Sequence, residues 1–201
     1  MRLFFSPGAC SLSPHIVTRE LGLDAKLERM DGKTHTLSDG ADYYGVNPKG
    51  SVPALALDNG ELLTEGAVIV QYLADQKPEA GLIPAAGTFD RYRLQEWLNF
   101  IATDLHKQLS PLYNPRVNDD GKAALKERFV QRLGVVAKRL EAGPWLMGAT
   151  YTVADPYLFT ILRWTARFEL DLEQWPSIVS FMSRMNERPA VKAALAAEGL
   201  S

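Results

Sequence analysis

The chain has 201 residues and a formal net charge of −2, with 22 Lys and Arg against 24 Asp and Glu. These charges are interspersed, which excludes the concentrated basic surface of a nucleic-acid-binding protein, and no apolar run approaches the ~18 residues of a membrane-spanning helix. A single cysteine cannot form an internal disulfide, and no signal-peptide pattern is visible. Together these features predict a soluble cytoplasmic protein of one large or two small domains, without nucleic-acid or membrane partners.

The first 80 residues predict short, alternating strands and helices. In chain order these are a strand at 3–5, a helix at 11–22, a strand at 26–30, a hairpin over 54–63 and a helix at 65–75. The hairpin prediction depends on Asp58-Asn59-Gly60, because Asn-Gly supplies the positive φ of a tight turn. The order β-α-β followed by β-β-α predicts a small α/β sheet with helices on its faces.

Beyond a loop-rich linker at 78–87, the pattern is almost entirely helical. One apolar stripe has three- and four-residue spacing: Leu94, Leu98, Ile101, Leu105, Leu109 and Leu112. Further helices are expected at 122–142, 153–168, 176–187 and 189–198. Thr152 and Asp155 fit a capping box, which has a structural role at a helix start. We therefore expect two domains, an α/β domain over 1–80 and an all-helical domain over 87–201.

Cys10, the only cysteine, lies between the first strand and the first helix. Proline is tolerated only in the first turn of a helix, so Pro14 requires the helix to begin near residues 9–11, with Cys10 at its N-terminus. The free amides and partial positive charge there favour a thiolate. The alternative is that Cys10 is a small buried apolar residue, as many free cysteines are. Ser13 occupies the place of a resolving cysteine, so redox chemistry at Cys10 would need an external thiol.

Two short segments of the first domain suit a ligand with a peptide backbone. If the Val52–Pro53 bond is cis, the backbone of Val52 is free to pair with an extended peptide; an ordinary trans proline at a strand start is the alternative. Glu65 and Gly66 begin a helix, where free amides can hold a carboxylate and the Glu65 side chain an ammonium. An acidic residue in a first helical turn is, however, common without any ligand.

A polar stripe lies on the long helix opposite its apolar stripe. At ~100° per residue, Asn99, Thr103, His106 and Ser110 share one face, with Lys107 nearby and Asp104 pointing elsewhere. This face is either solvated or directed across a cleft, where His106 and Lys107 would stabilise a thiolate. The other histidines have no comparable neighbours, and no metal-ligand spacing is present, so we expect no metal.

The whole chain closely resembles the bacterial beta-class glutathione transferases. The matching stretches, in order, are SPGACS, YYGVNPKGSVPAL, LLTEGAVIVQYLAD, EWLNFIATDLHK, YTVADPYLF and ERPAVKAALAAEGL. The resemblance implies a thioredoxin-like N-terminal domain, an all-helical C-terminal domain and a cytosolic homodimer. It also implies glutathione as co-substrate rather than a prosthetic group, bound in a cleft between the domains.

Carried over to this sequence, the resemblance implies a role for each matching residue. Cys10 and His106 would be catalytic, with Cys10 beside the glutathione sulfur and able to form a mixed disulfide with it. The glutathione-binding set would be Cys10, His35, Val52, Glu65, Gly66, Asn99, Thr103, Asp104, His106 and Lys107, next to a structural cis Pro53. Some of these contacts would come from the partner chain. The electrophile pocket would lie near Phe5, Tyr113 and Trp164.

Three departures from the family pattern leave the chemistry open. His35 stands where many members have a basic residue, Gly66 where many transferases have serine, and Phe5 in the region where transferases of other classes have a catalytic tyrosine. Ser11 therefore remains a second candidate for activating the glutathione sulfur. The expected function is conjugation of glutathione to hydrophobic electrophiles in detoxification. One alternative is a glutathione-dependent thiol–disulfide oxidoreductase or reductive dehalogenase that uses Cys10. A third possibility, of another class, is a non-catalytic binding or stress protein.

Overall fold

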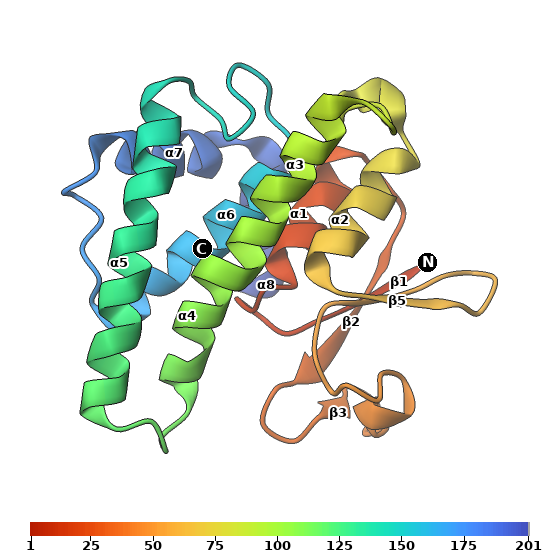
Figure 1. Cartoon of the computed structure of the whole chain (residues 1–201). Coiled ribbons are helices and arrows are strands. Elements are labelled where there is room, and N and C mark those ends of the chain that lie inside the picture. Colours follow the sequence, from red (N-terminus) through yellow and green to blue (C-terminus); the bar gives the residue numbers. More distant parts are fainter. Residues whose placement is uncertain (201) are drawn as a thin grey trace. The chain divides into compact units, whose positions relative to one another are not determined.

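A mixed five-stranded sheet lies in the N-terminal part of the computed structural model, which describes residues 1–200 (Figure 1). Its strands are β1 (Arg2–Phe5), β2 (Lys26–Asp31), β3 (Thr36–Leu37), β4 (Ala54–Ala56) and β5 (Leu62–Thr64). The order is β3-β2-β1-β4-β5, with β1 parallel to β2 and every other pair antiparallel. This confirms the predicted parallel unit and hairpin. Strand β3 was not predicted, because two residues are too few to show an alternating pattern.

The two faces of this sheet are covered differently because successive residues of a strand point to opposite sides. Helices α1 (Leu12–Glu20) and α2 (Gly66–Asp75) pack against each other on the sheet (Figure 1). Phe4 instead packs in a cluster with Met30, Tyr43 and Ala54. Tyr43 belongs to the short 3₁₀ helix η1 (Tyr43–Gly45) and is fully buried.

The C-terminal helix α8 (Pro189–Glu198) belongs to this first unit. The chain divides into one compact unit of Met1–Ala80 together with the segment from Glu187 onward, and a second unit of Gly81–Asn186. Helix α8 packs along α1, and Arg188 at its N-cap forms two hydrogen bonds with Glu20, of 2.6 and 3.0 Å. The division therefore differs from the expected one, in which 87–201 formed a single domain. Side-chain pairing across more than 160 residues of sequence carries no local signal.

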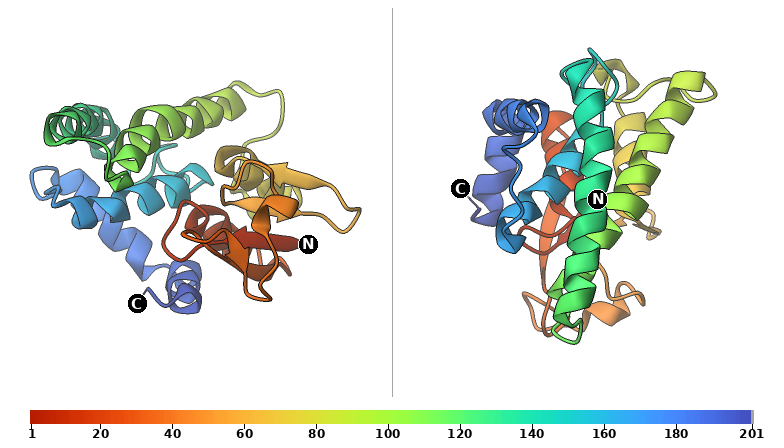
Figure 2. Two further views of the ribbon diagram at one scale, coloured as in Figure 1. Left: turned by 90° about the horizontal axis from the view of Figure 1, so that it is seen from below. Right: turned by 60° about the vertical axis from the view of Figure 1, so that its left-hand side comes forward.

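The second unit is helical throughout (Figure 2). Its α-helices are α3 (Phe89–Phe100), α4 (Lys107–Leu109), α5 (Asp119–Glu141), α6 (Ala154–Arg163) and α7 (Pro176–Glu187). Helix α5 packs along α4 and the segment that precedes it, as Figure 2 shows. The thioredoxin-like sheet unit and the helical unit are the two folds that the resemblance implies, and this expectation is confirmed.

The predicted long helix is interrupted in its middle. A π-helical segment, η3 (Ile101–His106), joins α3 to α4, and a 3₁₀ segment, η4 (Ser110–Tyr113), follows. The apolar stripe is nevertheless buried as predicted, with exposures from 0% at Leu94 to 8% at Leu112. The wider turn of a π-helix keeps residues four apart on one side, which suits the spacing of Ile101, Leu105 and Leu109.

Helix α6 begins at Ala154 with Val153 as its N-cap, so the predicted capping box forms only in part. The Thr152 hydroxyl donates to the Asp155 carboxylate at 3.3 Å, whereas a capping box would have it accept from a backbone amide. Asp155, which is fully buried, accepts a hydrogen bond from the Thr152 amide at 2.8 Å and another from the Leu146 amide at 2.9 Å. Its carboxylate therefore closes the helix start and also anchors the preceding loop. The 3₁₀ segment η5 (Trp164–Phe168) continues from the C-terminal end of α6.

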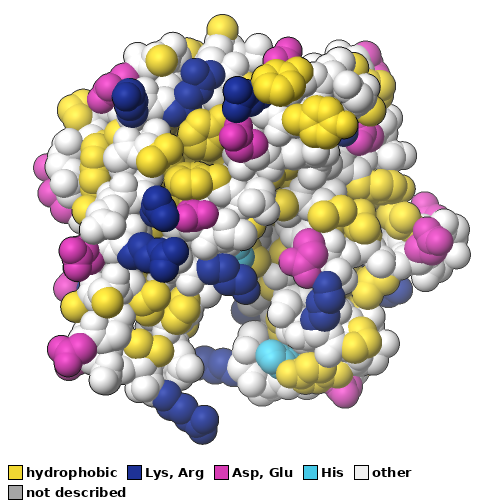
Figure 3. All heavy atoms as spheres, viewed as in Figure 1, with side chains coloured by type: hydrophobic (Ala, Val, Ile, Leu, Met, Phe, Trp, Pro, Cys, Tyr) yellow, Lys and Arg dark blue, Asp and Glu magenta, His cyan; other side chains and the backbone are white. Residues whose placement is uncertain are grey.

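The surface carries charges of both signs. On the face drawn in Figure 3, acidic and basic side chains alternate with apolar ones, as the composition predicts. Within residues 1–200, no helix combines the length and the hydropathy needed to cross a membrane.

Candidate active site

Cys10 lies in the turn between β1 and α1, just before the helix. Helix α1 begins at Leu12 with Ser11 as its N-cap, so Cys10 precedes the cap, slightly farther from the helix than predicted. Its thiol is partly exposed and donates a hydrogen bond to the Val52 carbonyl at 3.2 Å.

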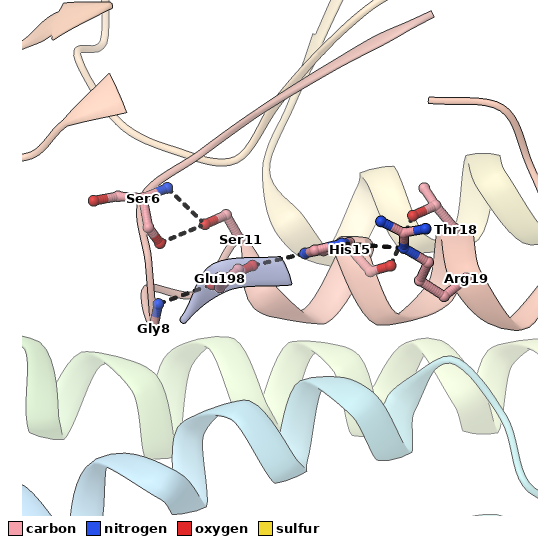
Figure 4. Close-up of polar contacts among 7 residues, drawn as sticks. All are labelled: Ser6, Gly8, Ser11, His15, Thr18, Arg19 and Glu198. Atoms are coloured by element: carbon pink, nitrogen blue, oxygen red, sulfur yellow. Dashed lines mark hydrogen bonds and ion pairs between the residues drawn. The ribbon is translucent and has the colours of Figure 1, made fainter. Parts of the chain in front are cut away.

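The turn that carries Cys10 is closed by Ser11 (Figure 4). Its buried hydroxyl accepts from the Ser6 amide at 3.2 Å and lies 3.3 Å from the Ser6 carbonyl, to which it donates. Ser11 is thus committed to the backbone of the turn, which leaves Cys10 as the better candidate to act on a ligand.

The same turn is fastened from the C-terminal helix by Glu198. One carboxylate oxygen accepts from the Gly8 amide at 2.9 Å, and the other lies 2.8 Å from Nδ1 of His15 (Figure 4). The side chains of His15 and Glu198 are both fully buried. Gly8 has a φ of 70°, in the left-handed region that glycine tolerates best. The turn therefore requires glycine at this position, and the Glu198 carboxylate holds the Gly8 amide in place.

The hydrogen bonds of His15 define its tautomer. Arg19 Nε, which can only donate, lies 3.4 Å from His15 Nε2, so Nε2 is the acceptor and Nδ1 carries the hydrogen donated to Glu198. His15 was expected to lack notable neighbours, and that expectation was wrong. Its partner is 183 residues away in the sequence.

The segment beside Cys10 is held by two side chains that bind one carbonyl. Tyr43 Oη donates to the Ser51 carbonyl at 3.0 Å and Asn47 Nδ2 donates to it at 2.7 Å. The Val52–Pro53 peptide bond is cis, as the resemblance implies. Burial raises the pKa of the Tyr43 hydroxyl, so it remains a donor at neutral pH.

Glu65 is held in an uncommon backbone conformation at the start of α2. Its φ of 69° is positive, which costs energy for a residue with a side chain and is often found at ligand sites. Its carboxylate lies 2.7 Å from Lys49 Nζ, and the next residue, Gly66, packs on Pro53. The first amides of α2 have no acceptor within the helix. Cys10, Val52, Glu65 and Gly66 are therefore gathered in one unit.

His35 lies in the turn after β2 with a φ of 55°. Its ring packs edge-on against Tyr44 at 4.9 Å, and its Nδ1 is covered by protein without a hydrogen-bond partner among the described residues.

In the second unit, the predicted polar residues lie around the π-helix η3. Thr103 Oγ1 contacts the Asn99 carbonyl at 3.0 Å and the Asp104 carboxylate at 2.8 Å. Asp104 also pairs with Arg132 of α5 at 3.0 Å. The 100° spacing used for the sequence prediction does not apply across a π-helix, which is why the pairing of Thr103 with Asp104 was not expected.

His106 ends the π-helix and joins a group of aromatic rings. Its Nδ1 lies 2.9 Å from Tyr157 Oη, and its ring packs edge-on against Trp164 at 5.0 Å. Tyr113 packs edge-on against Trp164 at 5.8 Å and against Phe168 at 4.8 Å. We call Tyr113, Trp164 and Phe168, with His106 beside them, the aromatic cluster. Lys107, next to His106, is exposed.

The structure thus brings two of the three residues predicted for the electrophile pocket, Tyr113 and Trp164, into ring contact. Phe5, the third predicted residue, belongs to the first unit, where it is 7% exposed with its ring 6.2 Å from His15. Sequence reasoning missed Tyr157, Phe168 and Glu198. No group of three His, Cys, Asp or Glu within residues 1–200 has a geometry that could hold a metal ion.

Family models match both units. The model for the glutathione S-transferase N-terminal domain matches residues 8–76, and the model for the C-terminal domain matches residues 100–189. The glutathione S-transferase GstA of Escherichia coli O157:H7 is 48% identical over 200 residues, covering all of both chains. The chain belongs to the glutathione S-transferase family.

Solved structures agree with this assignment. A sphingomonad glutathione S-transferase complexed with glutathione is 44% identical, with a TM-score of 0.96 over the whole of both chains. The bacterial beta-class enzyme of Sphingomonas chungbukensis is also 44% identical, with a TM-score of 0.97 and complete coverage of both chains. The expected resemblance to the bacterial beta class is confirmed.

Proposed function

We propose that this glutathione transferase joins the thiolate of glutathione to hydrophobic electrophiles. The observation that carries the proposal is the position of the Cys10 thiol, 3.2 Å from the Val52 carbonyl and beside a cis proline. In the same unit are the partly exposed backbone of Val52, just before β4, the Glu65 carboxylate and the free amides at the start of α2. These groups suit the cysteinyl backbone, the ammonium and the carboxylate of a γ-glutamyl peptide.

In this proposal, each group of the first unit has one task. Val52 pairs its backbone with the cysteinyl part of glutathione, while Glu65 and the Gly66 amide hold the γ-glutamyl end. In this structure Lys49 forms an ion pair with the Glu65 carboxylate. When glutathione binds, its ammonium replaces Lys49 as the partner of that carboxylate. His35 contributes to the glycine carboxylate, and Cys10 lies at the sulfur.

The second unit supplies polar and aromatic side chains. Asn99, Thr103, Asp104 and Lys107 contribute polar contacts to glutathione, and His106 acts on the sulfur with its ring oriented by Tyr157. Tyr113, which is 44% exposed and in edge-on contact with Trp164, accepts the electrophile on its ring. The aromatic composition favours flat, apolar electrophiles.

The test is the glutathione-dependent formation of a thioether from 1-chloro-2,4-dinitrobenzene. The thiolate adds to the carbon that bears chlorine, and chloride leaves. We expect a rate well above the uncatalysed reaction, because both reactants are held together and the thiol is ionised. A folded protein that shows neither this rate nor heat of glutathione binding by calorimetry would contradict the proposal.

The partly exposed thiol also supports a second candidate, a glutathione-dependent thiol–disulfide oxidoreductase. The Cys10 thiolate would attack oxidised glutathione, forming a protein–glutathione disulfide and releasing one glutathione thiolate. Mass spectrometry without reductant would show the chain plus one glutathionyl group, lost on reduction. Cys10→Ser and Cys10→Ala then separate the functions. Conjugation that survives both changes while disulfide reduction is lost assigns Cys10 to redox work.

We also propose that the protein is a homodimer built on the outer face of α3 and α5. Phe89 and Tyr92 are 69% and 60% exposed, and a groove of about 220 Å³ is lined by Glu96, Trp97, Phe100 and Val135. Figure 3 shows apolar side chains gathered over α3. Exposed aromatic rings beside a mostly apolar groove are typical of an interface, and a second copy of the chain offers the matching face.

Light scattering at micromolar concentration tests the dimer. We expect twice the mass of one chain, and Val135→Lys should shift the particle toward the monomer by burying a charge. Val179→Lys on α7, with a similar exposure of 43% against 47%, is the matched control and should remain dimeric. A wild-type particle with the mass of one chain would contradict the dimer.

We also propose that the protein works in the cytoplasm, because a protein that uses reduced glutathione fits a reducing compartment.

A further inference from the structure

The aromatic cluster carries a positive charge that the catalytic proposal does not use. Arg167, in η5, places its guanidinium carbon 4.9 Å from the centre of the Tyr113 ring. Its side chain is exposed, and no carboxylate of residues 1–200 forms an ion pair with it. The contact with Tyr113 holds this cation at the cluster without neutralising it.

The surroundings of Arg167 add no negative charge. Residues 163–168 include two arginines and no acidic residue. Burial raises the pKa of the Tyr113 hydroxyl, and the opposing effect of Arg167 is smaller, so this hydroxyl is neutral at physiological pH. Glu169 comes directly after this segment and has left-handed backbone angles. Its carboxylate does not form an ion pair with Arg167.

A planar guanidinium next to an apolar aromatic surface suits one kind of ligand. A carboxylate accepts two parallel hydrogen bonds from arginine, and an attached aromatic ring packs on neighbouring rings. Tyr113 is 44% exposed, so one of its faces or edges is available for such packing.

We propose that Arg167 selects aromatic electrophiles that bear a carboxylate. This inference rests on the proposed conjugating function and names a substrate class for it. The ring of the electrophile packs on the exposed part of Tyr113, beside the largely buried Trp164, and its carboxylate pairs with the Arg167 guanidinium. Arg167 is then a specificity-determining residue that acts on substrate binding, and it takes no part in the displacement of the leaving group.

A matched pair of substrates tests this selection. 4-Chloro-3,5-dinitrobenzoate and its methyl ester share the ring, the nitro groups and the leaving chloride, and differ in the charge of the carboxyl group. In Arg167→Gln we expect KM for the acid to rise about fivefold, as for the loss of a well-formed ion pair that is exposed to solvent. KM for the ester and kcat for both should stay near the wild-type values.

Two further variants serve as controls. Arg167→Lys keeps the charge without the planar fork, and we expect an intermediate KM for the acid. Arg163→Gln removes the neighbouring arginine, which packs on Phe159 at 5.7 Å, and should leave the preference for the acid unchanged. Added salt should weaken the preference of the wild-type protein, because the pair is exposed to solvent.

A binding measurement separates this inference from the conjugating function. Calorimetry with 3,5-dinitrobenzoate and its methyl ester, which lack the chlorine, reports binding without turnover. Tighter binding of the acid that disappears in Arg167→Gln supports the inference even when neither chlorinated substrate reacts, a result that would contradict the proposed function alone. Equal effects of Arg167→Gln on acid and ester would overturn the inference while leaving conjugation intact.

Discussion

The Cys10 turn and the aromatic cluster are built from different chemical groups. Around Cys10, backbone amides and carbonyls make most of the contacts: Ser11 bonds to the Ser6 backbone, Glu198 to the Gly8 amide and Cys10 to the Val52 carbonyl. Around His106, side chains meet side chains, through one hydrogen bond to Tyr157 and edge-on ring contacts.

This difference has a consequence for how each region tolerates change. Backbone contacts depend on the path of the chain, so most substitutions leave them in place. Loss of a side chain that binds this backbone, such as Glu198, affects the whole turn. Side-chain contacts change one residue at a time, and the cluster can alter its preference for electrophiles without altering the fold. We therefore expect changes around Cys10 to affect stability and glutathione binding together, and changes in the cluster to affect the electrophile.

The largest expected effect is that of Glu198→Gln. The carboxylate accepts from both the Gly8 amide and His15, whereas an amide has one oxygen and must turn its NH₂ group toward one of these donors. An unsatisfied donor in a fully buried place should lower the free energy of unfolding by about 3 kcal/mol. Urea denaturation measures this, and KM for glutathione should rise because the Cys10 turn loosens.

Glu20→Gln is the matched control, since Glu20 also links α1 to the start of α8. Its ion pair with Arg188 is partly exposed, with 12% and 29% of the two side chains accessible, so about 1 kcal/mol should be lost. Equal losses in both variants would show that Glu198 serves only to attach α8, with no special effect on the turn.

Tyr157→Phe tests the region held by side chains. The phenyl ring keeps the edge-on contact with His106, and the 2.9 Å hydrogen bond to Nδ1 is lost. We expect the free energy of unfolding to fall by about 1 kcal/mol and kcat/KM for conjugation to fall about tenfold, because the His106 ring is no longer fixed. Calorimetric affinity for glutathione should not change. A weaker affinity with unchanged kcat would assign Tyr157 to glutathione binding instead.

The two regions also differ in how far the sequence predicts them. Pro14 is a local signal, and it placed Cys10 in the turn before α1 to within two residues. The Asn59-Gly60 turn and the buried leucine stripe are equally local, and both were found. Two of the features that the sequence did not predict connect distant segments: the pairing of His15 with Glu198 and the packing of α8 on α1. The third is the π-helix η3, which depends on backbone hydrogen bonding and changes which side chains around Asp104 share a face.

The smallest expected effect is a gain at Gly66. A Cβ atom there would meet Pro53 at 3.5 Å, an ordinary contact, and the backbone of Gly66 does not require a positive φ. Gly66→Ser therefore fits, and its hydroxyl at the start of α2 adds a donor toward the γ-glutamyl carboxylate. We expect the dissociation constant for glutathione to fall about fivefold, equivalent to one net hydrogen bond.

Gly66→Ala is the control for this gain, because it fills the same space and lowers the entropy of the unfolded chain without adding a hydroxyl. Both variants should gain similar stability in urea denaturation, and only Gly66→Ser should bind glutathione more tightly by calorimetry. If both variants bind glutathione more weakly than the wild type, the ligand backbone approaches Gly66 too closely for any Cβ. The glutathione site would then require that residue 66 has no side chain. The γ-glutamyl carboxylate of glutathione would be held by the backbone amides of α2 alone.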